Sequence, residues 1–185
     1  MKHILPVLTV SALAAAASAQ TAPAPSAKQA LSYNRVIVSH VTTNDSVYDN
    51  GASVFAQAKI GGGIYIAAST LDLNNASELD GVDNTVAVLG YAYTLPSFIG
   101  ITSDLNVQVG YKSVGVGIRA LIGGGVEIDV SHTHGVGGDG NDLFSVGASY
   151  NLGFLVKGLS LNASYDSYSG AGNPDVTSVG IGYNF

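Results

Sequence analysis

The sequence of 185 residues contains no cysteine and no tryptophan, and only 11% of its residues are charged. Without cysteine, the chain has no disulfide framework and no cysteine-based metal site. An ordinary soluble domain carries roughly 25% charged residues. The shortage of charge fits a protein that shows an apolar surface to lipid, and it also fits a glycine-rich secreted β protein. The acidic balance, with 7 Lys and Arg against 13 Asp and Glu, argues against nucleic-acid binding, which needs basic patches.

Long hydrophobic runs are missing beyond the amino-terminus. There, a basic start precedes the apolar stretch ILPVLTVSALAAA and the small residues ASA, which is the pattern of a secretory signal peptide cleaved before Gln20. The stretch is short for the roughly 20 residues of a membrane-spanning helix. The sequence therefore predicts a signal peptide at 1–19, a flexible Pro/Ala-rich leader at 20–30 and a folded domain at 31–185.

Apolar and polar residues alternate through this domain, which indicates β-strands. In DLNVQVGYK, for example, Leu105, Val107 and Val109 share one face, and Asp104 and Asn106 share the other. Most of the predicted strands have about the 9–11 residues that a tilted membrane strand needs. The ten predicted strands are 32–43, 52–60, 64–73, 84–94, 104–112, 114–122, 126–133, 143–152, 159–168 and 177–185.

The polar face of these strands consists of small Gly, Ser and Asn residues rather than long charged ones. Small polar side chains suit the crowded interior of a narrow barrel, while the apolar face meets lipid. Only a closed barrel satisfies the backbone of membrane strands. We therefore predict an all-β fold, a closed antiparallel up-and-down transmembrane β-barrel of about ten strands, with eight as the alternative. The least certain division is a tight turn at Lys112-Ser113.

Two turns with three glycines, 61–63 and 123–125, set the register of their hairpins, because glycine tolerates the positive φ of short loops. The second turn places Arg119 opposite Asp129, with Glu127 diagonal, all pointing inward. The first places Lys59 inward, opposite Tyr65. Unpaired buried charge is costly, so we interpret Arg119, Glu127 and Asp129 as a lumen charge cluster that plugs the barrel. A proton or ion path is the alternative.

The two ends of the predicted barrel differ in chemistry. With both termini periplasmic, aromatic residues collect near the strand ends, like the girdles of outer-membrane barrels. The aromatic residues are Tyr33, Tyr91, Tyr93, Tyr150, Tyr183 and Phe185 at the inner end, and Tyr111 and Tyr165 at the outer end. The outer loops are acidic, which favours solubility or the attraction of cations. Their acidic residues are Asp45, Asp49, Glu78, Asp80, Asp83, Asp139, Asp142 and Asp175.

Candidate metal ligands are few and weak. GGDGNDLFS at 137–145 matches one calcium repeat, but such sites need stacked copies. His132 and His134 lie two residues apart and, with Asp139 or Asp142, make a weak zinc or copper candidate. We therefore expect no metal site and no cofactor.

An enzyme is the alternative class of function. Asp129, His132 and Asp139 offer the residue types of omptin proteases, which are ten-stranded outer-membrane enzymes. Those proteases are much longer, and this sequence has no serine-nucleophile motif and no phosphate-binding loop. We therefore expect no catalytic residues.

The carboxy-terminal SVGIGYNF resembles the assembly signal of bacterial outer-membrane barrels, with Ser178, Gly180, Tyr183 and Phe185 in its key places. Residues 31–185 resemble the OmpA/OmpX-like superfamily, and the block DLNVQVGYKS…GIRALIGGGVEIDVS is similar to small barrels of the xanthomonad kind. The resemblance implies export through the periplasm to the outer membrane. It also implies that outer-membrane lipid, the barrel-assembly machinery and periplasmic chaperones are partners, and it leaves any extracellular partner unknown.

Small barrels fill their interior with side chains, and aqueous channels need about 16 strands. The function we expect is a non-catalytic structural or surface-interaction role with a side-chain-filled lumen. A narrow small-solute or ion channel is the main alternative.

Overall fold

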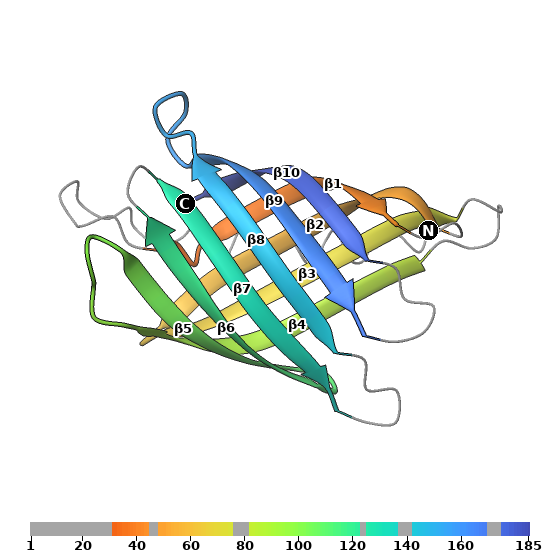
Figure 1. Cartoon of the computed structure of the whole chain (residues 1–185), viewed down its shortest axis with the longest axis horizontal. Helices are drawn as coiled ribbons and strands as arrows, with labels where there is room; N and C mark the ends of the chain where they lie inside the picture. Colours follow the sequence, from red (N-terminus) through yellow and green to blue (C-terminus); the bar gives the residue numbers. More distant parts are fainter. Residues whose placement is uncertain (1–30, 45–47, 76–81, 123–124, 137–141, 170–174) are drawn as a thin grey trace.

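Ten antiparallel strands form one closed barrel in the computed structural model (Figure 1). The structure describes residues 31–44, 48–75, 82–122, 125–136, 142–169 and 175–185. Each strand pairs with its neighbours in sequence, and β1 pairs with β10 to close the ring. The strands are β1 (Arg35–Thr43), β2 (Tyr48–Gly61), β3 (Ile64–Asn75), β4 (Val82–Thr94), β5 (Thr102–Gly110), β6 (Ser113–Ile122), β7 (Val126–Gly135), β8 (Leu143–Asn151), β9 (Leu159–Tyr168) and β10 (Val176–Asn184).

The predicted strand number of ten is confirmed, and the alternative of eight is wrong. Most boundaries agree within a few residues, but β2 and β4 begin earlier than expected, so Asp49 and Asp83 belong to strands rather than loops. The predicted tight turn falls one residue earlier, at Tyr111-Lys112, where Lys112 adopts a φ of 55°. The predicted signal peptide and leader lie outside the described residues.

The predicted residue pairs of both hairpins are confirmed, but the three-residue loop at 61–63 is wrong, because a bulge between Lys59 and Gly61 shortens the turn to 62–63. Arg119 lies opposite Asp129 in the β6–β7 pair, and Lys59 lies opposite Tyr65 in the β2–β3 pair. At the closing pair, Arg35 lies opposite Asn184 and Thr43 opposite Val176. Every strand thus has hydrogen-bonded neighbours on both sides, and the barrel has no free edge.

The outer surface of the barrel is apolar. Alternate residues of the strands project large hydrophobic side chains away from the lumen, and they remain exposed because no other described segment packs over them. Examples are Val38, Leu89, Val107, Val109, Leu161, Val179 and Ile181, each between 47% and 61% exposed. Of β10, Val179, Ile181 and Tyr183 face outward as predicted, and Gly180 and Gly182 face inward. No helix among the described residues is long and apolar enough to cross a membrane.

The barrel has two ends that carry different connections. The terminal end is where β1 begins and β10 finishes, and it carries the turn at 62–63 and the connections 95–101 and 152–158. The distal end is the opposite one and carries the Tyr111-Lys112 turn.

Candidate functional site

The sequence predicted a first strand that begins at residue 32, but β1 begins at Arg35. The residues before it fold across the terminal end of the lumen. Tyr33 is only 5% exposed, and its hydroxyl donates a hydrogen bond to Asn106 Oδ1 of β5 at 2.7 Å. Its ring lies 5.1 Å from that of Tyr65. Tyr33 is therefore not part of an outward aromatic girdle. A buried tyrosine needs a partner for its hydroxyl, and the inward Asn106 supplies it.

A charge cluster spans the lumen beside Tyr33. Glu127 of β7 binds two guanidinium groups with one oxygen, Arg119 Nη2 at 2.6 Å and Arg35 Nη1 at 2.8 Å. Arg119 comes from the neighbouring β6, whereas Arg35 comes from β1, on the far side of the ring. One carboxylate thus ties opposite walls of the barrel together with charge-assisted hydrogen bonds, the strongest kind available to side chains.

Other contacts fix the two arginines in place. Arg119 also donates to the Ser32 carbonyl at 3.0 Å, and its guanidinium lies 4.5 Å from the centre of the Tyr33 ring. Arg35 donates to Gln57 Oε1 at 3.2 Å and lies 5.2 Å from the centre of the Phe55 ring. These cation–π contacts favour a guanidinium over an ammonium at both positions.

The three charges predicted to face the lumen, Arg119, Glu127 and Asp129, lie at its terminal end, where Arg119 binds Glu127 and Asp129 lines the cavity. Arg119 binds the diagonal Glu127 rather than Asp129, although Asp129 stands directly opposite in the register. The carboxylate of Asp129 lies instead over Gly147 of β8, where the absence of a side chain leaves room for it.

Two buried polar atoms at this end, Asp104 Oδ1 and Arg119 Nη1, have no hydrogen-bond partner among the residues that the structure describes. Asp104 of β5 stands opposite Arg119 in the register. Both side chains are only 5% exposed. The acceptor and the donor therefore lie on adjacent strands.

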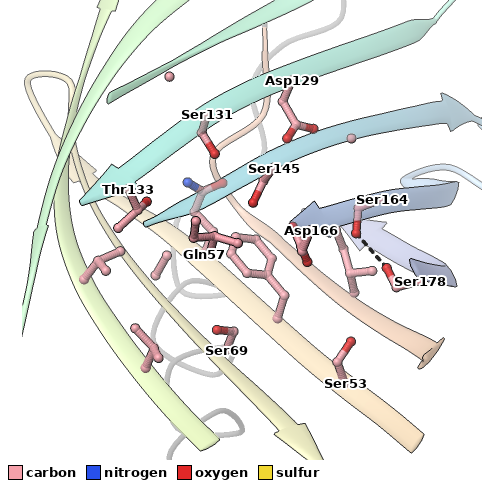
Figure 2. A pocket seen from close by; sticks show the side chains of 18 of the residues that line it. Ser53, Gln57, Ser69, Asp129, Ser131, Thr133, Ser145, Ser164, Asp166 and Ser178 are labelled. Carbon is pink, nitrogen blue, oxygen red and sulfur yellow. Dashed lines mark hydrogen bonds between the residues drawn. The ribbon is translucent and has the colours of Figure 1, made fainter. Parts of the chain in front are cut away.

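The middle of the lumen is a cavity of about 700 Å³ (Figure 2). Small hydroxyl side chains line much of its wall, and Ser164 and Ser178 hydrogen-bond each other across neighbouring strands at 2.7 Å. Asp129 and Asp166 also face it. The expectation of a side-chain-filled lumen is therefore wrong for the middle of the barrel, because serine, glycine and alanine are too small to fill a ten-stranded barrel.

An apolar cluster narrows the distal part of the lumen on one side. Val41, Leu73 and Val176 are almost fully buried, and Leu71 and Tyr168 pack against them. They come from adjacent strands, β1, β3, β9 and β10, with β2 between β1 and β3. The cavity thus has a hydroxyl and carboxylate wall from β7 to β10 and a more apolar wall at β1 to β3.

At the distal end, a clasp joins the two closing strands. The backbone amide of Asp175 donates to Asn44 Oδ1 at 2.9 Å, and Asn44 Nδ2 donates to Asp175 Oδ2 at 3.0 Å. The Tyr165 hydroxyl also donates to Asp175 Oδ2, at 2.8 Å. The hydrogen bonds from Tyr165, Ser167 and Asn44 hold the pKa of Asp175 below its ordinary value. Asp175, one of the predicted acidic outer-loop residues, thus links the distal ends of β1 and β10.

The weak metal candidates are not brought together. His132 and His134 face outward from β7, and His134 Nδ1 lies 2.6 Å from Asp142 Oδ1. No group of three potential ligands forms within the described ranges. Asp139, like Asp45, Glu78, Asp80 and most of the GGDGNDLFS motif, lies outside them.

The omptin-like arrangement is not formed by the described residues either. Asp129 lines the lumen cavity, whereas His132, three residues further along β7, faces outward. The two side chains therefore lie on opposite faces of the barrel wall and do not form a catalytic pair.

The other predicted aromatic residues lie where the sequence placed them. Tyr91, Tyr93, Tyr150 and Tyr183 face outward near the terminal end, each between 44% and 56% exposed. Phe185 follows β10, donates its amide to the Asn34 carbonyl at 3.0 Å and stacks on Tyr183. Tyr111 and Tyr165 are exposed near the distal end.

Sequence reasoning missed Arg35 and Tyr33. The first predicted strand alternates poorly, and no turn connects β1 to β10, so nothing in the sequence fixes their register. The sequence does contain one signal. Arg35 lies four residues before Ser39, so both side chains lie on the same strand face, and this face of β1 lies opposite small residues of β10. Asp104 and Asn106 were placed correctly on the inward face.

The structure defines the chain as a closed ten-stranded antiparallel barrel with an apolar exterior and a polar lumen. No protein-family model matches the sequence, and no curated protein matches it. Similar solved structures include a KdgM porin, with 13% identity, a TM-score of 0.48 and coverage of 82% of this chain and 99% of the other. The outer membrane protein Omp33 of Acinetobacter baumannii has 10% identity and a TM-score of 0.44, with coverage of 85% and 100%.

A mutant porin of Rhodopseudomonas blastica has 20% identity and a TM-score of 0.40 over 81% of this chain, which spans about half of that porin, 51% of its length. At these identities and scores, the function of this chain has to be argued from its own residues.

Proposed function

We propose that this chain is a non-catalytic integral barrel of the bacterial outer membrane, closed at its terminal end, with a structural or surface-interaction role. Its predicted route is export through the periplasm. Its partners on that route are periplasmic chaperones, the barrel-assembly machinery and outer-membrane lipid.

The apolar exterior supports insertion into a membrane. A barrel whose outward residues are large hydrophobics, while serines, glycines and charges face inward, is inverted relative to a soluble barrel. Exposed to water, this surface would exceed the apolar patches that soluble monomers tolerate. The assembly signal at Ser178, Gly180, Tyr183 and Phe185 lies on and just after β10, the strand that closes the ring, which suits a role in recognition during assembly.

The proposal that the lumen is closed rests on one observation, the Arg35–Glu127–Arg119 cluster beside Tyr33. The cluster joins β1, β6 and β7 across the barrel, and the segment before β1 covers it with Tyr33 and Ser32. An ion that crossed this end would have to break charge-assisted hydrogen bonds in a poorly solvated place, which is costly.

Single-channel recording in planar bilayers tests the closed lumen. The wild-type barrel should give no steady conductance, and Arg119→Ala should open a small one, because it removes both the guanidinium and its contact with Ser32. His40→Ala, which removes an exposed outward side chain from β1, is the matched control and should stay silent. A variant Arg119→Ala that remained silent would refute the assignment of this cluster as the closure.

A narrow channel for small solutes or ions is the second candidate, because the cavity of about 700 Å³ provides most of a path. Steady conductance of the wild-type protein, or swelling of vesicles that contain it, would favour this function. A screen of peptide substrates with the folded barrel tests the non-catalytic part of the proposal, and cleavage that depends on Asp129 or His132 would overturn it.

A further inference from the structure

Two connections at the terminal end carry large apolar side chains that none of the described residues covers. In the β4–β5 connection, Phe98 is 73% exposed and Ile99 83%. In the β8–β9 connection, Phe154, Leu155 and Val156 are 72%, 66% and 54% exposed. Figure 1 shows both connections, green and blue, projecting from the same end of the barrel. Short turns in water usually carry Gly, Asn, Asp or Ser instead.

The β4–β5 connection holds its apolar tip at a conformational cost. Phe98 and Ile101 exchange backbone hydrogen bonds of 3.2 and 2.9 Å around Ile99-Gly100. Ile99 has a φ of 48° and Gly100 a φ of 75°, so both central residues are left-handed, as in a type I′ turn. A β-branched residue is rare in this conformation, where Asn or Gly is the usual choice. Strained residues of this kind point to a role for the side chain.

The β8–β9 connection is equally well defined. Its backbone closes through hydrogen bonds from Leu152 to the Leu159 carbonyl and from Leu155 to the Leu152 carbonyl, both 2.8 Å. Three consecutive apolar side chains therefore stay exposed on an ordered turn. Lys157 follows them directly and is also exposed, which places a cation beside an apolar tip, as in segments that lie at anionic lipid surfaces.

Both tips continue the apolar exterior of the barrel. Tyr93 precedes the first connection and Tyr150 the second, and both face outward, 56% and 44% exposed. The apolar surface thus extends from the strands through the tyrosines toward the tips.

We propose that Phe98-Ile99 and Phe154–Val156 are lipid anchors that insert into the boundary between headgroups and acyl chains and so fix the depth of the barrel. This inference rests on the proposed membrane insertion. The occupant is phospholipid, because the tips are continuous with the lipid-facing surface and one of them carries a lysine for the phosphate groups.

The absence of tryptophan from the chain allows a direct test with single-tryptophan reporters. Phe98→Trp and Phe154→Trp are folded into vesicles of phosphatidylcholine and phosphatidylglycerol, brominated either near the headgroup or near the bilayer centre. Leu161→Trp, on the outward face of β9, is the reference for a lipid-facing side chain. We expect lipid brominated near the headgroup to quench both tip reporters more strongly than lipid brominated near the centre.

The outcomes separate the anchors from membrane insertion itself. If the Leu161→Trp reference is quenched by lipid but the tip reporters are quenched only by aqueous acrylamide, the anchors are refuted and the membrane barrel stands. If neither lipid nor acrylamide quenches the tips, they are buried against protein, such as a second copy, and the anchors are again refuted. If the reference itself escapes lipid quenching, the proposed membrane insertion fails as well.

Discussion

At the scale of single residues, Glu127 holds the lumen charge cluster together. One of its oxygens accepts charge-assisted hydrogen bonds from two buried guanidiniums on opposite walls. Removing one partner of a buried ion pair costs far more than the pair contributes net, because a buried charge is left without compensation. Here the loss of one carboxylate would leave two positive charges facing each other.

We therefore expect Glu127→Gln to lower the free energy of unfolding by about 3–5 kcal/mol. Urea unfolding in detergent micelles, followed by circular dichroism, measures the change. Asp72→Asn, which alters an exposed carboxylate on the outward face of β3, is the matched control and should change little. A loss for Glu127→Gln no larger than that of the control would mean that the cluster is not a structural plug.

The lowered pKa of Asp175, in the clasp between β1 and β10, predicts how the thermal stability of the barrel depends on pH. Its pKa in the folded protein is lowered from 3.8, first by the hydrogen bond from Tyr165 and then by those from Ser167 and Asn44. A lowered folded pKa means that the stabilisation is complete above the unfolded value and disappears as the pH falls through the folded one. The wild-type melting temperature should therefore drop in this acid range.

Asp175→Asn should lack that part of the acid dependence, while Tyr165→Phe should reduce it, because it removes the largest cause of the shift. Melting temperatures of the three proteins over a pH series, from neutral to below 3.8, provide the measurement. Parallel curves for all three would show that the clasp contributes nothing to the pH dependence.

At the scale of elements, the closing pair of β1 and β10 depends on small residues. Gly180 lies opposite Ser39, and a Cβ at Gly180 would collide with the Val38 carbonyl oxygen and the Ser39 side chain. Backbone atoms of a paired strand have little freedom to move aside, so a methyl group here would push the two strands apart.

Gly180→Ala should destabilise the barrel by about 1–3 kcal/mol, the usual cost of overpacking. The fraction of protein that shows heat-modifiable mobility on gels, across a urea series, reports this loss. Thr177→Ala, an outward and exposed position on the same strand, should behave like the wild type. Equal curves for both variants would show that the closing pair tolerates the extra methyl group.

The elements were largely predictable from the sequence, and the closing pair was not. Alternation located all ten strands, and the glycine turn at 123–125 fixed Arg119 opposite Asp129. The same register did not show which carboxylate Arg119 binds, because that depends on the reach of a long side chain and on the space above Gly147. Arg35 and Tyr33 belong to the site through contacts across the lumen, for which no local pattern exists. The cavity was not predictable from any single strand either, because it depends on the combined volume of the inward side chains of all ten strands.

At the scale of the whole molecule, the two surfaces of the barrel wall have different solvents if the proposed membrane insertion is correct. Val107 of β5 faces outward and is 51% exposed, whereas its neighbour Gln108 faces the lumen and donates a hydrogen bond to Thr133 Oγ1 at 3.3 Å. Adjacent positions on one strand can therefore report on the two environments.

In lipid vesicles, Val107→Arg should cost about 2–4 kcal/mol, as a cation does near the middle of a bilayer. Gln108→Arg should cost less, because the lumen offers hydroxyl groups, carboxylates and space. Equilibrium unfolding by guanidinium in the presence of vesicles gives both values. The reverse order would assign the apolar face to a contact other than lipid.

Closure by β10 also has a consequence for biosynthesis. Because β1 pairs with the last strand, the edge of β1 stays unpaired until almost the whole chain is available, and such an edge invites pairing with other chains. Arg35 and Glu127, 92 residues apart in sequence, meet only when the ring shuts. Contacts this distant in sequence form late and slowly. The Arg35–Glu127 contact therefore marks a completed barrel. Until the ring closes, the unfinished barrel must be kept from aggregating.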